Sequence, residues 1–541
     1  MLKLSEEKLV VIVAALSQLS MQLIANMATV IIPEIAMELN ISVDMQLYIN
    51  IIYLSSLVAM SIPLAKIITQ YGVKKSVKMS CYLLIVSLVL CAFSFDFYMI
   101  LLARLFQGIS CAALAISIYM MLVETLEDEE LGTALGLVGS CGYIGLMLAP
   151  SLTGLITFYT DWRTVFLLLI PFFILQLVLL YLIKSEWRQE KKPIDYIGSV
   201  IYILMMVLFT IGLTELDSVY NICLLLSIVL VPVFVKYEKK KDTPILNVRL
   251  FRNIKLVIGT YAAMATYFVT TIAITVLTYH QVYPADMDLN MVGLVLLVTP
   301  LTMVFVSIIA GKLSSKIDPR IISGCSLLVI LLSMVMLASL QYLPFELIIL
   351  ACVIQGIGHG FFSSPNNKYV LTLPDEKDLA DTSAVLATSK EFGKILSSGI
   401  YTLLFAFFLE GVVLGPPEFD TALMFTNHVM IVITEVLLIT AAILLFYSKF
   451  KYERYENPRI LGLAYSLMPK SLKRGARGAM KVKDSAVENT LKLKDVFDLN
   501  TVRETASTIK DTTIDTATTI KDTTVDTAKS TKDTAMNLKD K

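Results

Sequence analysis

The sequence has few charged residues for its length. Asp, Glu, Lys and Arg make up 17% of its 541 residues, whereas hydrophobic residues make up 56%, and the mean hydropathy is +0.73. An ordinary soluble protein is far less apolar than this. The composition therefore excludes a water-soluble enzyme and predicts a protein that lies in a membrane.

The sequence also lacks the motifs of several other protein classes. It has no GxxxxGK[ST] run, so we expect no ATP-driven pump in this chain. Its seven cysteines form no CxxC pair and show no Cys/His spacing typical of a metal site. We interpret them as small packing residues, and we expect no disulfide, no metal ion and no cofactor.

Long apolar segments fill most of the first 448 residues. A helix needs about 17 to 25 apolar residues to cross about 30 Å of hydrocarbon, and most of these segments reach that length. We therefore predict an all-α membrane protein with fourteen transmembrane helices. The segments are 9–32, 47–65, 79–95, 97–123, 133–158, 164–183, 196–214, 219–235, 256–281, 290–310, 321–339, 345–364, 388–410 and 426–448.

The gaps between these segments alternate in charge. The odd-numbered gaps together carry a single cation, Arg163. Because cytoplasmic loops are rich in Lys and Arg, the basic even-numbered gaps are predicted to face the cytoplasm, with both termini on that side. The fourth gap is acidic from Glu124 to Glu130, but acidic residues contribute little to this rule. The basic gaps contain Lys66, Lys74, Lys75 and Lys78; Lys184, Arg188, Lys191 and Lys192; seven cations from Lys236 to Lys255; Lys312, Lys316 and Arg320; and Lys368, Lys377, Lys390 and Lys394.

Several spans carry more than hydrophobicity. Arg104, Gln107 and Gly108 share one face of the fourth span, and a charge at that depth normally faces a cavity or a partner. The fifth span has a surface of small residues at helical spacing, which allows another helix to approach closely, and a proline that loosens the helix locally. This surface contains Gly136, Gly139, Gly142, Gly145, Ala149, Pro150 and Gly154.

Six sequence fragments stand out in order along the chain: Arg104 to Gly108, Gly145 to Gly154, Asp161-Trp162-Arg163 leading to Pro171, Pro193 to Gly198, Pro244 to Arg252, and Gly311 to Arg320. Taken in this order, they resemble motifs of the major facilitator superfamily, in particular its fourteen-helix drug:proton antiporter branch. The resemblance covers about residues 10–448. It implies two six-helix halves around an inserted helix pair, with a substrate cavity at mid-membrane between the halves. A short basic turn with Gly72 occupies the place in the first half that Gly311, Asp318 and Arg320 occupy in the second.

The sequence departs from the family pattern at three positions. The first-half loop motif has Ala65 where glycine is usual and Thr69 where an acidic residue is usual. This disfavours a charge interaction that would latch the loop to a neighbouring helix. Ile24 stands where the family's first helix often carries a carboxylate, so proton coupling through that position is not expected.

Candidate substrate-pathway residues lie on the first, fourth and ninth spans. Gln18, Gln22 and Asn26 form a polar stripe on the first span, which is either a wall of the substrate cavity or an interhelical hydrogen-bond seam. Arg104 with Gln107 is a second candidate, and its alternative role is a structural cation that ties the fourth helix to carbonyls of the first. The third is Tyr279, in a run that resembles the family's Tyr-Leu-Gln.

Two carboxylates are candidates for proton coupling. Glu435 lies near the centre of the last span, where a carboxylate stays protonated unless it faces water or a cation. Its alternative role is a neutral group hydrogen-bonded to a neighbouring helix. Glu34, near the outer end of the first span, is either a proton site or an exposed carboxylate at the outer mouth. We interpret Asn366, Asn367, Lys390 and Glu391 as helix-end and gating contacts more than as ligands.

The composition changes abruptly after the last span. The basic cluster Lys449–Lys483 is suited to anionic lipid headgroups. An 11-residue repeat follows it, which is either a disordered tail or a weak amphipathic helix on the membrane surface.

These observations predict four parts and one function. The parts are an N-terminal six-helix bundle (1–190), an inserted helix pair (191–250), a C-terminal six-helix bundle (251–450) and a cytoplasmic tail (451–541). We expect a monomer in the plasma membrane that exports small amphipathic or cationic compounds by alternating access, driven by protons, with no nucleic acid partner. The alternatives are a proton-coupled symporter that imports a metabolite and a non-transporting sensor or scaffold that acts through the tail.

Overall fold

The computed structural model describes residues 5–41, 43–46, 48–187, 194–214, 221–282, 289–409 and 417–452. Helices dominate these residues, because backbone groups in hydrocarbon must satisfy their hydrogen bonds within the segment. Each of the fourteen expected apolar segments corresponds to one helix of at least 18 residues. Of the predicted tail (451–541), the structure describes only residues 451 and 452. The repeat and nearly all of the basic cluster therefore lie outside the described residues.

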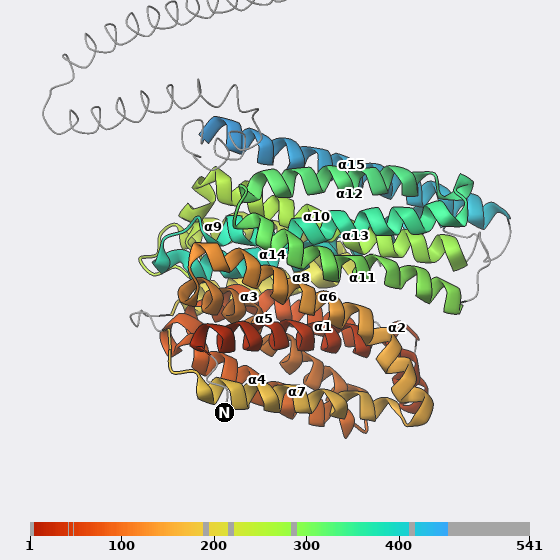
Figure 1. Ribbon diagram of the computed structural model, residues 1–541. Helices are drawn as coiled ribbons and strands as arrows, with labels where there is room; N and C mark the ends of the chain where they lie inside the picture. The colour runs from red at the N-terminus through yellow and green to blue at the C-terminus, as the bar shows by residue number, and fades with distance from the viewer. Residues whose placement is uncertain are drawn as a thin grey trace, which may run out of the picture. The chain divides into compact units, whose positions relative to one another are not determined.

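The helices form two halves and a connecting pair (Figure 1). The first half contains α1 (Glu6–Glu38), the short α2 (Val43–Gln46), α3 (Tyr48–Tyr71), α4 (Val73–Ala92), α5 (Phe97–Thr125), α6 (Asp128–Tyr159) and α7 (Trp162–Leu182). The connecting pair is α8 (Tyr196–Thr214) and α9 (Asn221–Glu238), followed by the 3-10 turn η1 (Val248–Arg252). The second half contains α10 (Ile254–Val282), α11 (Leu289–Ser314), α12 (Pro319–Ala338), η2 (Leu340–Tyr342), α13 (Phe345–Leu371), η3 (Glu376–Asp378), α14 (Leu379–Leu409) and α15 (Pro417–Tyr452).

Twelve of the described helices, not the fourteen expected, are both long and apolar enough to cross a membrane. The two that do not qualify are α9 and α14. α9 is the shortest of the long helices, with 18 residues. α14 has 31 residues, but Asp381, Lys390, Glu391 and Lys394 lower the hydropathy of its first half.

Those same charges led to a wrong helix boundary. The sequence places Lys390 and Glu391 at the opening of a span, but α14 begins at Leu379, and both residues lie well inside it. Asn366 and Asn367 likewise lie within α13, which continues to Leu371. Hydropathy averages over all faces of a helix, so polar side chains that are turned inward lower it and hide the true helix ends.

The two halves meet mainly along two helix pairs. α6 packs against α11, and α3 packs against α14. α8 touches both α3 and α14, so the connecting pair lies against both halves. α4 packs against α7 and α12 packs against α15, and Figure 1 shows these pairs at opposite edges of the bundle.

The basic gaps and the acidic gap lie at the same end of the bundle, which we call the basic end. Contacts join these gaps to one another. Lys74 Nζ donates to the carbonyl of Ile183 at 2.5 Å, which joins the second gap to the end of the sixth span. Lys66 forms an ion pair with Asp381, and the same carboxylate accepts from the backbone N–H of Asn247 at 3.2 Å. Across the halves, the Ser315 hydroxyl donates to the Glu129 carbonyl at 2.5 Å, and Lys368 Nζ donates to the Asp128 carbonyl. The alternation of charge along the sequence thus corresponds to two ends of one helical bundle.

Candidate functional site

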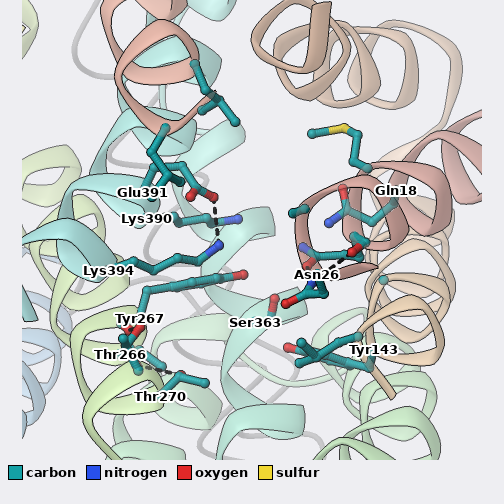
Figure 2. Close-up of a pocket in the computed structure, with 18 of the residues that line it drawn as sticks. Gln18, Asn26, Tyr143, Thr266, Tyr267, Thr270, Ser363, Lys390, Glu391 and Lys394 are labelled. Carbon is teal, nitrogen blue, oxygen red and sulfur yellow. Dashed lines mark hydrogen bonds and ion pairs between the residues drawn. The ribbon is translucent and has the colours of Figure 1, made fainter. Parts of the chain in front are cut away.

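A cavity of about 470 Å³ lies between the two halves. Its lining comes from α1, α3, α5 and α6 of the first half and from α10, α11, α13 and α14 of the second, with Thr210 from α8. Volumes of this size are typical of sites for small organic molecules. Figure 2 shows its polar side chains in two groups that face each other, from α10 and α14 on one side and from α1 on the other.

The α1 group is the polar stripe expected from the sequence. Gln18, Gln22 and Asn26 all line the cavity, because their spacing of four residues keeps them on one helix face. Asn26 Nδ2 donates to the carbonyl of Gln22 at 2.7 Å and lies 3.3 Å from its side-chain oxygen. Gly142 of α6 lies behind Gln18, and a Cβ there would be 2.9 Å from Gln18 Cγ. Close packing on α6 therefore holds the amide wall in place.

The α14 group carries the charge of the cavity. Lys390, Glu391 and Lys394 line it. Lys394 Nζ pairs with Glu391 Oε1 at 2.9 Å. Lys390 Nζ instead donates to Tyr119 Oη on α5 at 2.6 Å, and only 6% of Lys390 is exposed. The two lysines on this helix thus have different partners, one a carboxylate and the other a neutral hydroxyl.

Aromatic and hydroxyl side chains complete the lining. Tyr119 and Tyr267 present their rings to Lys390 at 4.9 and 5.5 Å, and Lys394 lies 5.4 Å from the ring of Tyr267. Tyr143 lies opposite this group in Figure 2. His359 of α13 is also buried in the lining, within hydrogen-bond distance of the Thr270 hydroxyl. The cavity therefore offers rings, hydroxyls and one cluster of charges.

Arg104 and Gln107 lie behind the cavity and are fully buried. The guanidinium donates to Gln107 Oε1 at 2.8 Å, to the carbonyl of Ile49 at 3.2 Å and to Asn50 Oδ1 at 3.1 Å. It also faces the ring of Tyr53 at 4.3 Å. Arg104 thus ties α5 to α3, and not to α1 as the alternative reading expected. Asn50 and Tyr53 line the cavity, so Arg104 contacts two of the lining residues from behind.

Contact between α6 and α11 closes the space between the halves toward the basic end. A Cβ on Gly136 would lie 2.6 Å from the Ser307 carbonyl, and a Cβ on Gly311 would lie 2.6 Å from the Gly132 carbonyl. The Ser140 hydroxyl donates to the Val304 carbonyl at 2.7 Å across the same contact. At the other end, a Cβ on Gly154 of α6 or on Gly293 of α11 would meet nothing within 4 Å. The helices therefore touch at the basic end and diverge toward the opposite one.

An ion pair between α3 and α14 forms a second contact at the basic end. Lys66 Nζ lies 2.7 Å from Asp381 Oδ1, and the carboxylate is 1% exposed. The first-half loop motif was not expected to make such a latch, because Thr69 replaces its usual acidic residue. The structure corrects this: the latch is made by a lysine of the motif, and its acidic partner lies in the other half.

The two proton-coupling candidates and the substrate-pathway candidate Tyr279 lie away from the cavity. Glu435 is half-buried on α15, next to the exposed Val432 and Val436. Glu34 is half-buried on α1, beyond the polar stripe. Tyr279 packs against Tyr401, with ring centroids 5.8 Å apart and the ring planes tilted by 44°. None of these residues is part of the cavity lining formed by the described residues.

The motif residues have separate structural roles. Gly72 has φ of 95°, a conformation that favours glycine at the α3–α4 turn. Gly108 packs on α3, where a Cβ would clash with the Tyr53 carbonyl at 2.4 Å, and Gly145 packs on α1 near the Leu19 carbonyl. Pro150 lies inside α6.

Asp318 and Arg320 form a buried pair at the start of α12. Asp318 caps the helix by accepting from the Arg320 backbone N–H at 2.8 Å, and it binds the Arg320 guanidinium at 2.9 Å. Lys449 of α15 binds the same carboxylate at 2.7 Å. Burial opposes ionisation of Asp318, but the hydrogen bonds from Arg320 and Lys449 outweigh it and lower the pKa of the carboxyl. The cluster therefore joins α12 to α15 at the basic end.

The comparison with known protein families agrees with this geometry. The family described as Major Facilitator Superfamily matches residues 14–398. The chain belongs to the Major Facilitator Superfamily. It is a multi-pass membrane transporter and not an enzyme, and the superfamily match extends from α1 into α14.

Individual relatives of this superfamily member are distant. "Riboflavin transporter RibZ" of Clostridioides difficile is 24% identical over 378 residues, which cover 69% of this chain and 83% of the relative. "Drug efflux pump JefA" of Mycobacterium tuberculosis is 23% identical over 341 residues, covering 60% of this chain and 66% of the pump. The crystal structure of the human organic anion transporter MFSD10 superimposes with a TM-score of 0.59 at 11% identity, over 81% of this chain and 99% of that one. At such identity the structural match shows the fold alone.

Sequence reasoning missed the charged wall of this transporter. Lys390 and Glu391 were interpreted as helix-end and gating contacts, and Lys394 was only counted among the cations of a basic gap. Tyr119 and Tyr267 drew no attention among 24 tyrosines. One available signal was the spacing itself: Lys390 and Lys394 are four residues apart and so share a helix face. Starting the predicted helix near Asp381 and not at residue 388 would have placed both lysines in the middle of the helix.

Proposed function

We propose that this chain exports a small organic molecule by alternating access, with proton entry as the driving force. The observation that carries the proposal is the cavity between the halves, closed toward the basic end by α6–α11 contact while the same helices separate at the other end. A site that opens to one side at a time is what a secondary transporter needs.

The membrane topology belongs to the proposal. We propose that α9 and α14 also cross the bilayer, giving fourteen spans in a 6 + 2 + 6 arrangement, because each packs along helices that qualify as spans. The positive-inside rule would then place the basic end and both termini in the cytoplasm of a plasma-membrane protein. In this orientation the cavity of the described structure faces outward.

The direction of transport rests on two supports. The α6 run from Gly145 to Gly154 resembles the antiporter motif of the drug-efflux branch, and a drug efflux pump is among the relatives. Import by proton symport is the second candidate, favoured by the absence of a carboxylate at Ile24 of α1. A relative that carries riboflavin makes a metabolite a reasonable substrate for either direction.

Reconstitution tests the proposal directly. Purified protein in proteoliposomes, given an imposed pH gradient and a panel of aromatic dyes and metabolites, should move at least one compound against its concentration gradient. Antiport predicts that substrate and protons move in opposite directions, whereas symport predicts the same direction. A variant truncated after residue 452 should transport equally well, and transport that persists without the tail would rule out the sensor or scaffold hypothesis.

A further inference from the structure

The charge of the cavity is informative about its ligand. The lysines and carboxylates of the lining all come from α14, as Lys390, Glu391 and Lys394. Over the described residues, Glu391 is the only carboxylate in the lining, and no arginine contributes to it. Two lysines and one carboxylate leave a formal excess of one positive charge. A cationic compound would meet net repulsion here, contrary to the expectation from the sequence.

The excess charge is located on one side chain. The Glu391 carboxylate neutralises Lys394 at 2.9 Å. Lys390 donates to the Tyr119 hydroxyl at 2.6 Å, and no carboxylate of the described residues lies within ion-pair distance of its Nζ. Only 6% of Lys390 is exposed. A buried charge without a counter-ion is costly, and a ligand anion would remove that cost.

The surroundings of Lys390 complete a site for an organic acid. Tyr119 and Tyr267 hold their rings 4.9 and 5.5 Å from the ammonium, which leaves flat apolar surface beside the charge. The amide groups of Gln18 and Asn26 supply neutral hydrogen-bond donors and acceptors on the opposite wall (Figure 2). A cavity of about 470 Å³ has room for an aromatic molecule of two or three rings.

We propose that the transported substrate is a small aromatic anion whose acidic group binds Lys390 and whose rings lie among the cavity tyrosines. This inference rests on the proposed transport function and specifies the chemistry of its site. Lys390 is the specificity-determining residue because it supplies the only cation in the cavity that a described protein carboxylate does not neutralise. Glu391 and Lys394 form an internal pair that leaves the anion to Lys390.

Two dyes with the same xanthene ring system but opposite charge test the proposal: fluorescein, an anion, and an esterified rhodamine, whose blocked carboxylate leaves it a cation. Fluorescence anisotropy in detergent should show that the purified full chain binds fluorescein at least tenfold more tightly than rhodamine. Lys390→Met keeps the length of the side chain and removes its charge, so fluorescein affinity should fall at least tenfold while rhodamine affinity holds or rises. Lys390→Arg should retain most fluorescein binding. Lys239→Met, an exposed lysine just after α9, is the control for general charge effects.

The outcomes separate the two proposals. Preference for rhodamine, absence of fluorescein binding, or unchanged fluorescein affinity in a folded Lys390→Met protein would overturn the anion site. Thermal melting of each variant establishes that it is folded. If fluorescein binds in a Lys390-dependent way but no dye crosses the membrane in proteoliposomes, the anion site stands and the transport function is wrong.

Discussion

Breaking the Lys66–Asp381 ion pair should open the basic end of the transporter. The pair joins α3 to α14 across the two halves, and the Asp381 carboxylate also accepts from the backbone N–H of Asn247 at 3.2 Å. Lys66→Met leaves that carboxylate 1% exposed with one backbone donor. Under the proposed alternating access, opening the basic end would separate α3 from α14 and break the pair, so its loss should destabilise the closed state more than the open one.

The size of the effect follows from the burial of each partner. Two unit charges at 2.7 Å attract by about 6 kcal/mol at an effective dielectric constant of about 20, and desolvation of the carboxylate offsets much of this. Deleting one partner of a fully buried pair costs about 3–5 kcal/mol. The Lys66 side chain is 27% exposed, so we expect about 1–3 kcal/mol. Since about 1.4 kcal/mol is a factor of ten, the equilibrium between closed and open basic ends should shift roughly 5- to 150-fold.

Hydrogen–deuterium exchange of the protein in lipid nanodiscs measures this shift. In Lys66→Met, peptides from the basic-end halves of α6, α11 and α14 should exchange faster, and peptides from the opposite ends of α6 and α11 should be more protected. The charge-swapped double variant, Lys66→Asp with Asp381→Lys, should restore much of the wild-type pattern.

The matched control is the exposed pair Lys377–Asp375 at the same end, whose side chains are 70% and 78% exposed. Exposed pairs contribute little, so Lys377→Met should leave the pattern unchanged. The reasoning is refuted if Lys66→Met exchanges like the wild type, or if Lys377→Met has an equal effect.

Three further predictions address α6, the Asp318 cluster and proton coupling. Gly136→Ala should lower the free energy of unfolding by about 1–3 kcal/mol through overpacking against α11. Gly154→Ala on the same helix should be neutral or stabilising, because a Cβ there meets nothing within 4 Å. Equal melting temperatures of the two variants would contradict this. The pKa of Asp318 is lowered by Arg320 and Lys449, so its stabilisation is present above its unfolded pKa, near 3.9, and is lost as pH falls through the native value. Asp318→Asn should therefore lower the melting temperature at pH 6 and flatten its decline in acid, and a parallel decline would refute this. In proteoliposomes, Glu435→Gln should abolish substrate-induced proton flux while leaving ligand binding intact. Glu391→Gln is the comparison inside the cavity. Unchanged flux in Glu435→Gln together with loss of flux in Glu391→Gln would assign proton coupling to Glu391.

The sequence was sufficient for the all-α membrane fold because lipid imposes simple rules, although twelve and not fourteen of the described helices qualify as spans. Apolar length and the alternation of Lys and Arg depend only on local composition, and both correspond to features of the bundle. The stripe of Gln18, Gln22 and Asn26 was also accessible, since a run of polar residues every four positions on an apolar helix is conspicuous. Each of these signals lies within one segment.

The rest of the site depends on contacts between segments, which local patterns do not contain. Lys66 and Asp381 are 315 positions apart, and nothing near either residue indicates the other. The small-residue surface of α6 was visible in the sequence, but the helices that pack against it were not. Gly136 packs against α11, whereas Gly145 packs against α1. Glu435 was conspicuous because it interrupts a hydrophobic run. Among the described residues, however, the carboxylate that lines the cavity is Glu391, which the sequence places at the end of a helix.

α14 gives a physical reason to connect substrate binding with closure of the basic end. The helix carries the latch residue Asp381 near its start and Lys390 in the cavity nine positions later, a distance of about 14 Å along a helix. Helix α14 has no internal proline over its described residues, so this stretch is expected to move as a rigid unit. An anion that draws Lys390 toward the α1 wall would therefore change the position of Asp381 relative to Lys66. Accordingly, fluorescein should alter deuterium exchange at the start of α14 in the wild type and not in Lys390→Met, and an identical response in both would show that the two sites are independent.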